Sequence, residues 1–162
     1  MPEAFRFAEQ AVTPSGVILC AGCTPDGICR LGVTSKVASG IDEITFELAC
    51  GPEYEGAGGV AHGAWIAGVM DEAVGSLPQS LGVSCVTASL TVDYRAPVPL
   101  GRSLTLTARV RERDARRWSV IAELRLGKSG PMLAQGHARM VHPDPAHFAR
   151  YQEWLAEHDD AG

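Results

Sequence analysis

The chain has 162 residues, of which 46% are apolar, and this length and composition suit one globular domain with a substantial core. Its formal net charge of −5 lacks the basic excess of nucleic-acid-binding domains, so we expect no nucleic-acid partner. The N-terminus does not read as a signal peptide, and no apolar run approaches the roughly 18 residues that cross a bilayer. The sequence therefore predicts a cytoplasmic protein without a membrane partner.

Five cysteines without a signal peptide indicate reduced thiols, because an odd number cannot pair completely. Cys20, Cys23 and Cys29 lie close enough in sequence to suggest a metal or redox cluster. A structural zinc site needs four ligands, usually as two close pairs, but no second pair follows and the nearest histidine is His62. We therefore expect no metal, and a packing or loop-lining role for these cysteines.

The first half of the chain predicts strands followed by one long helix. Residues 16–37 alternate short apolar segments with the turn sequence TPDG, and residues 40–50 show the alternation of a half-buried strand. A glycine-rich loop is expected over 51–60 and the helix over 61–77. The apolar positions of the predicted strand are Ile41, Ile44, Phe46 and Leu48.

The predicted helix has very little polar surface. It combines large apolar residues such as Val69 and Met70 with many Ala and Gly residues, and it contains neither Lys nor Arg. A helix of this composition is expected to be covered by other elements. The adjacent acids Asp71 and Glu72 interrupt it, and a carboxylate placed in an apolar helix needs a partner or a function.

After the helix, the apolar period changes to two, which predicts four half-buried strands in antiparallel order. An antiparallel sheet curled around one central helix accounts for both patterns. The fold class is therefore α+β, in a single domain over residues 1–162 with its core at about 17–142. The strands are expected over 84–96, 103–114, 116–126 and 131–142, and a short amphipathic C-terminal helix is expected over 145–158.

Two segments, GPEYEGAGGVAHGAWIAGVMDEAVG and TASLTVDYRAPVPLG, carry a family pattern. The pattern is a Gly-rich loop, His-Gly-Gly, an Asp nine residues after the His, and a strand ending in an aromatic residue, Pro and Leu-Gly. With the opening CAGCTPDGICRLGV, the chain resembles the hotdog-fold acyl-CoA thioesterases of the PaaI-like branch over residues 17–142. The resemblance implies a hotdog fold, hydrolysis of an acyl-CoA thioester without a cofactor, and a homodimer or homotetramer.

Two positions depart from the family pattern. Ala64 replaces the second glycine of His-Gly-Gly, which keeps the residue small, and Gly56 replaces the small polar residue that some members carry six residues before the His. The second change removes a group that positions water in those members. Trp65, one turn into the helix, is expected in the core or at the floor of the acyl pocket.

Thioester hydrolysis needs a hydrogen-bond donor for the developing oxyanion and a group that delivers oxygen to the carbonyl carbon. The first turn of a helix offers free backbone N–H groups at the positive end of the helix dipole. The resemblance assigns the oxyanion hole to the amide of Gly63, where glycine lets a carbonyl group approach closely. His62 orients this loop, either as a helix cap or in direct contact with substrate.

Asp71 is the candidate catalytic acid. In the resembling family this Asp acts as a general base on water or as a nucleophile, and the sequence leaves both roles open. The alternative is a solvated helix residue with Glu72 as its exposed neighbour. Gly63 and Asp71 lie roughly 12 Å apart along one helix axis, too far to act on the same carbonyl group. Catalysis by both therefore requires two chains whose central helices pack side by side.

The remaining candidates come from the strands after the helix. Thr87 matches the family's Ser/Thr that hydrogen-bonds the acid or its water, or is only a β-branched strand residue. Tyr94 and Pro97 lie where pantetheine runs in relatives. Arg116 and Arg117, at a predicted hairpin, either contact the phosphates of coenzyme A or belong to a solvated turn.

Two other functions compete with this interpretation. A non-catalytic acyl-CoA binding or sensing module on the same fold is favoured by the departures at Gly56 and Ala64. The related hydratases carry a His five residues after the helix Asp, where this chain has Ser76, so that class is disfavoured. The acyl group remains open.

Overall fold

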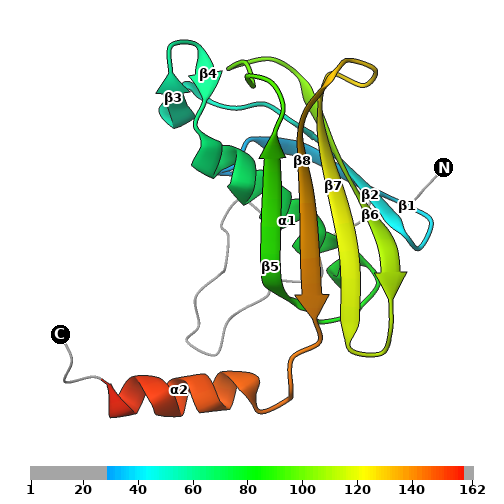
Figure 1. Cartoon of the computed structure of the whole chain (residues 1–162), viewed down its shortest axis with the longest axis vertical. Coiled ribbons are helices and arrows are strands. Elements are labelled where there is room, and N and C mark those ends of the chain that lie inside the picture. Colours follow the sequence, from blue (N-terminus) through cyan, green and yellow to red (C-terminus); the bar gives the residue numbers. More distant parts are fainter. Residues whose placement is uncertain (1–28, 159–162) are drawn as a thin grey trace.

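The computed structural model describes residues 29–158. Six strands form one antiparallel sheet, and the long helix α1 (Gly63–Ser80) packs across one face of it (Figure 1). The strands, in their order across the sheet, are β1 (Val33–Ser39), β2 (Glu43–Leu48), β6 (Leu104–Arg113), β7 (Arg117–Leu126), β8 (Met132–Val141) and β5 (Val86–Tyr94). The two edges of the sheet are thus β1 and β5.

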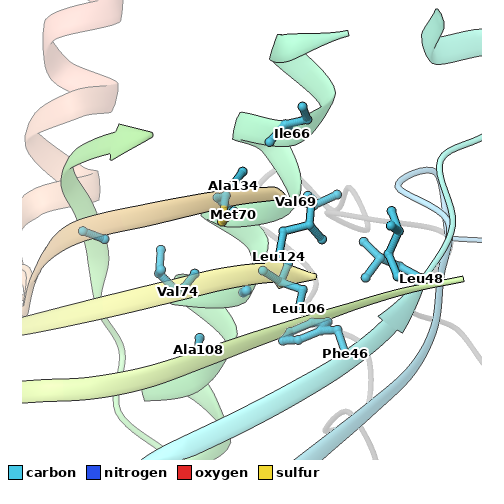
Figure 2. Close-up of a cluster of buried hydrophobic side chains, with 14 of the residues drawn as sticks. Phe46, Leu48, Ile66, Val69, Met70, Val74, Leu106, Ala108, Leu124 and Ala134 are labelled. Atoms are coloured by element: carbon cyan, nitrogen blue, oxygen red, sulfur yellow. The ribbon is translucent and has the colours of Figure 1, made fainter. Parts of the chain in front are cut away.

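The core lies between α1 and the sheet, because alternate residues along β2, β6, β7 and most of β8 are buried beneath the helix. Side chains of α1 meet those of β2, β6, β7 and β8 there (Figure 2). Full burial of one large apolar side chain stabilises the fold by about 1.5–3 kcal/mol, so this face holds α1 on the sheet. Core residues include Phe46, Ile66, Val69, Met70, Val74, Leu106, Ala108 and Leu124.

The four strands expected after the helix are confirmed, each within two residues of its predicted ends. The helix begins two residues later than expected, because the backbone of His62 is extended, and it ends three residues later. A proline in a helix removes one backbone hydrogen bond, and Pro78 lies in the last turn. The hydroxyl of Ser80 donates to the carbonyl of Leu77 at 2.7 Å and closes this turn.

The segment expected to be a glycine-rich loop contains more structure. A 3₁₀ turn at Pro52–Tyr54 leads into a small hairpin of β3 (Glu55–Ala57) and β4 (Val60–Ala61). Its turn uses Gly59 at a φ of 75°, a conformation that glycine adopts without strain. Strands of three and two residues are too short to show a periodic pattern, so the sequence did not reveal them.

Two further expectations concern Ile41 and the C-terminus. Ile41 was expected in the strand, but it lies in the β1–β2 turn with 61% of its surface exposed. The C-terminal helix is confirmed as α2 (His147–Glu157), which buries none of its side chains. Within residues 29–158, neither helix is long and apolar enough to cross a membrane.

Candidate active site

His62 caps the N-terminus of α1. Its Nδ1 accepts a hydrogen bond from the amide of Ala64 at 3.0 Å, so this nitrogen carries the lone pair and Nε2 carries the proton when the ring is neutral. The amide of His62 donates to the carbonyl of Tyr54 at 2.7 Å, which ties the helix start to the preceding 3₁₀ turn. The structure thus places His62 as the helix cap.

The amide of Gly63 is the first of the helix and has no acceptor among the described residues. The neighbouring amides of Ala64 and Trp65 bond to His62, so the Gly63 N–H remains a free donor at the positive end of the dipole. The hydroxyl of Tyr94, at the end of β5, donates to the Gly63 carbonyl at 3.1 Å. This contact fixes the end of β5 against the start of α1.

Gly56 is required by packing. A Cβ atom at this position would lie 2.7 Å from the Cα of His62, closer than real Cβ atoms approach. The absence of a polar side chain therefore follows from the close approach of β3 to the helix cap. The segment after β5 also runs along this loop, since the amide of Ala61 donates to the carbonyl of Val98, next to the exposed Pro97, at 2.8 Å.

Asp71 is exposed on the outer face of α1, whereas the adjacent Met70 is fully buried. Residues three, four and seven positions apart share a helix face. In α1, the residues at these offsets on the outer side of Asp71 are small and not fully buried: they are Ala64, Ala67, Gly68 and Gly75. Asp71 therefore offers its carboxylate from a flat surface that another backbone or a substrate can approach closely.

Glu72 lies on a different flank of α1. Its Oε1 accepts a hydrogen bond from the ammonium of Lys36 on β1 and another from the hydroxyl of Ser76 at 3.2 Å. Because β1 is the sheet edge opposite β5, these contacts place Glu72 on the flank away from β5. The view of Glu72 as only an exposed neighbour of Asp71 is therefore wrong, since its side chain is 36% exposed and paired.

Thr87 lies near the opposite end of β5 from Tyr94. Its hydroxyl contacts the thioether of Met140 at 3.5 Å, and a thioether is a weak acceptor, so the hydroxyl can still serve a stronger one. Thr87 and Tyr94 are seven positions apart along the strand, which corresponds to roughly 23 Å. The structure therefore brings Gly63 and Tyr94 together and keeps Thr87 apart from them.

The β6–β7 hairpin separates the two predicted arginines. Arg117 lines a hollow of about 320 Å³, whereas Arg116 does not line it and acts electrostatically on Asp144. The amides of Arg116 and Arg117 donate to Asp114 and hold the pKa of that carboxyl below its usual range. The hollow is lined by Glu112, Arg113, Asp114, Arg117, Trp118, Ser119 and Arg139.

Sequence reasoning missed two of the three arginines in this hollow. Arg113 pairs with Asp42 at 3.5 Å and lies over the Trp118 ring, whereas Arg117 and Arg139 form no ion pair within the described part of the chain. Arg139 comes from β8, two strands away in space from β6, and no sequence signal links it to the hairpin. The register of β7 and β8 places Arg139 opposite Ser119, and both residues line the hollow.

Trp65 belongs to the core. It is 3% exposed, and its ring lies 6.5 Å from the ring of Tyr54. Its indole Nε1 is buried without a hydrogen-bond partner among the described residues. Trp65 thus lies in the core, and a role at the floor of the acyl pocket stays a prediction.

The cysteines within residues 29–158 are free thiols. Burial raises the pKa of Cys50 to about 11, with Glu53 adding to the shift, and burial also raises the pKa of Cys85. Cys20 and Cys23 lie outside the described residues. Among those described, no group of three potential metal ligands occurs, and the expectation of no zinc stays a prediction.

Residues 58–132 match a family model described as Thioesterase superfamily. Over 75 residues the chain is 35% identical to the acyl-coenzyme A thioesterase THEM4 of Xenopus laevis, which covers 46% of this chain and 34% of that protein. The chain thus matches about a third of the length of that curated relative.

Solved structures share the fold. The Escherichia coli PaaI protein, from a phenylacetic acid degradation operon, has a TM-score of 0.61 at 19% identity and covers 69% of this chain and 78% of its own. The Streptococcus mutans protein smu.793, bound to acetyl-CoA, has a TM-score of 0.62 at 18% identity and covers 67% and 86%. With its sheet wrapped around α1 as expected, the chain has the hotdog fold of these structures, and its residues 58–132 match the Thioesterase superfamily model.

Proposed function

We propose that this protein hydrolyses an acyl-CoA thioester to the free acid and coenzyme A. The observation that carries the proposal is the free Gly63 amide at the mouth of α1, on a helix that also presents Asp71 outward. The named activity of the Xenopus laevis relative and the acetyl-CoA bound by the Streptococcus mutans protein support an acyl-CoA substrate.

The reaction uses two groups. The Gly63 N–H binds the thioester carbonyl oxygen and stabilises the negative charge that develops there. Asp71 either removes a proton from the attacking water or attacks the carbonyl carbon itself, forming an anhydride that water then cleaves. In both routes the C–S bond breaks, and the coenzyme A thiolate leaves and takes up a proton.

The two groups act from different chains. Within one chain Gly63 and Asp71 are roughly 12 Å apart along the helix axis. A two-fold axis at Leu90, the middle of β5, would pair this edge strand with its copy and lay Thr87 opposite the partner's Asp93, beside the partner's Tyr94. One site would then combine Gly63 and Tyr94 of one chain with Asp71 and Thr87 of the other. This assembly is a homodimer or a homotetramer built from it.

The hollow at the β6–β7 hairpin suits the phosphates of coenzyme A. It lies at the end of the sheet where β5 begins, since Arg117 and Val86 both stand opposite Val141 in register. In the two-chain arrangement this end approaches the partner's helix mouth, where Tyr94 and Pro97 flank the pantetheine. Arg117 and Arg139 are then available for charge-assisted hydrogen bonds.

The double change Arg117→Ala with Arg139→Ala is expected to raise KM for acyl-CoA about three- to tenfold, because exposed charge-assisted contacts contribute modestly. KM for the same acyl group on pantetheine, which lacks the nucleotide, should not change. Lys128→Ala, at the opposite end of β7, is the control. An equal rise in KM for both substrates would place the phosphates elsewhere.

Thiol release across a panel of acyl-CoA esters tests the activity. Phenylacetyl, hydroxybenzoyl and medium-chain esters sample aromatic and aliphatic groups, and saturable release of coenzyme A from at least one is expected. The alternative is a non-catalytic acyl-CoA binding or sensing module, favoured by the departures at Gly56 and Ala64. Tight binding without thiol release by the parent protein would establish that alternative.

A further inference from the structure

Lys36 is a buried cation on an edge strand. Only 7% of its side chain is exposed, although β1 ends the sheet, because the side chain reaches inward beneath α1. Its ammonium pairs with Glu72 and lies 5.1 Å from the centre of the Phe46 ring. Lys36 stands opposite Phe46 in the register of β1 and β2, so both project toward the helix.

Glu72 links Lys36 to Ser76, which lies one turn further along α1. The same Oε1 atom that binds Lys36 accepts a hydrogen bond from Ser76, a hydroxyl side chain that is 4% exposed. One carboxylate oxygen thus connects the edge strand to the helix at a residue next to Asp71. These contacts cross from the sheet to the helix flank, where they resist rotation of α1.

A contribution to stability alone does not explain why a buried ion pair such as Lys36–Glu72 is present. Removing two charges from water offsets much of their attraction, and apolar residues of similar size are often as stabilising. The outer face of α1 adds little resistance to rotation, because it carries Ala67, Gly68 and Gly75, which have no side chains large enough to interlock. Of these, Gly68 meets only Leu31, at 3.8 Å from where its Cβ would stand.

We propose that Lys36 and Glu72 are positioning residues that set the rotation of α1 about its axis and thereby the direction of the Asp71 carboxylate; this inference rests on the proposed function. An outward side chain lies about 5–6 Å from the helix axis, so a rotation of about 10° displaces it by about 1 Å. A displacement of 1 Å at a reacting group can cost about 10²-fold in rate.

The test replaces the pair with apolar residues of similar volume, Lys36→Met with Glu72→Leu. We expect a Tm at or above that of the parent, KM within about threefold, and kcat lowered at least about tenfold. The matched control removes a surface pair on the other side of the sheet, Lys128→Met with Glu47→Leu, whose charged atoms lie 3.1 Å apart. That control should leave kcat unchanged.

A second readout separates positioning from a purely structural role. If the pair aims Asp71, then Asp71→Asn should cost less in the Lys36→Met, Glu72→Leu background than in the parent, because the carboxylate is already misplaced. The reversed pair, Lys36→Glu with Glu72→Lys, restores the contact and should recover part of the lost kcat. Additive losses, or a kcat within threefold of the parent at unchanged Tm, would overturn the inference.

The inference can still be tested if the variant Lys36→Met with Glu72→Leu does not fold. In that case Glu72→Gln and the reversed pair decide together: a low kcat in Glu72→Gln that the folded reversed variant recovers supports positioning, and equal kcat in these two folded variants contradicts it. An inactive parent protein would instead contradict the proposed function. The two failures are therefore distinguishable.

Discussion

Replacing Asp71 with asparagine should lower kcat by about 10²–10⁴-fold, since the change removes both a general base and a nucleophile while keeping the shape of the side chain. Asp71 is exposed on the single chain and makes no ion pair among the described residues, so Tm should change by only a few degrees. Binding of acyl-CoA should persist. The measurements are kcat on the best panel substrate, a melting curve and a binding isotherm.

The matched control is Glu153→Gln, the same acid-to-amide change at an exposed helix residue of α2. It should leave kcat within a few-fold of the parent. Full activity in Asp71→Asn would show that the helix carboxylate is not the catalyst. Glu72→Gln provides a contrast of a different kind, because it removes the negative charge that pairs with the buried ammonium of Lys36, and it should lower Tm.

The arrangement of strands and helices followed from local patterns in the sequence. Strands such as β6 alternate strictly, with Leu104, Leu106 and Ala108 fully buried, so their period of two was readable without the fold. The helix was recognisable from its apolar composition, and the capping role of His62 was one of two roles expected. The resemblance pointed to Gly63 and Tyr94 separately, and the structure joins them by a hydrogen bond, while their roles stay predictions.

Other features depend on contacts between residues distant in sequence. The pairing of Lys36 with Glu72 joins residues 36 positions apart, and the sequence offers only a lysine among otherwise uncharged strand residues as a hint. The need for glycine at position 56 arises from the close approach of two loops, which no local pattern encodes. The hollow with Arg139 depends on strand register across β7 and β8.

The distinction between Asp71 and Glu72 also required the structure. A step of one residue turns the side chain by about 100° around the helix, and sequence alone does not say which direction faces the sheet edge β1. The contact with Lys36 settles the direction of Glu72. Asp71 is left on the small-residue face, where a second chain can approach.

The second large effect concerns the Gly63 amide, which a side-chain change normally cannot remove. Proline lacks the N–H and is well tolerated at the first position of a helix. The residue before proline must be extended, and His62 already has φ −64° and ψ 140°. Gly63→Pro should therefore fold with Tm near that of the parent and lose about 10²–10³-fold in kcat, the typical cost of removing one oxyanion donor.

Gly63→Ala is the matched control, because it adds a Cβ and keeps the amide. That Cβ would lie 3.6 Å from the Tyr94 ring, an ordinary van der Waals distance. Any loss in Gly63→Ala measures crowding of the substrate, and the further loss in Gly63→Pro measures the hydrogen bond. Equal kcat in the two variants would show that this amide does not stabilise the oxyanion.

Mixing the two inactive variants tests whether the site is shared between chains. In a mixed dimer of Asp71→Asn and Gly63→Pro chains, one site carries both defects and the other carries neither. Random exchange between equal amounts of the two chains makes half of the dimers mixed, and each mixed dimer has one intact site out of two. Refolding the variants together should therefore restore about a quarter of the parental activity. If one chain held a complete site, every site would keep one defect and no activity would return. A parent protein that sediments as a stable, active monomer would contradict the shared site in the same way.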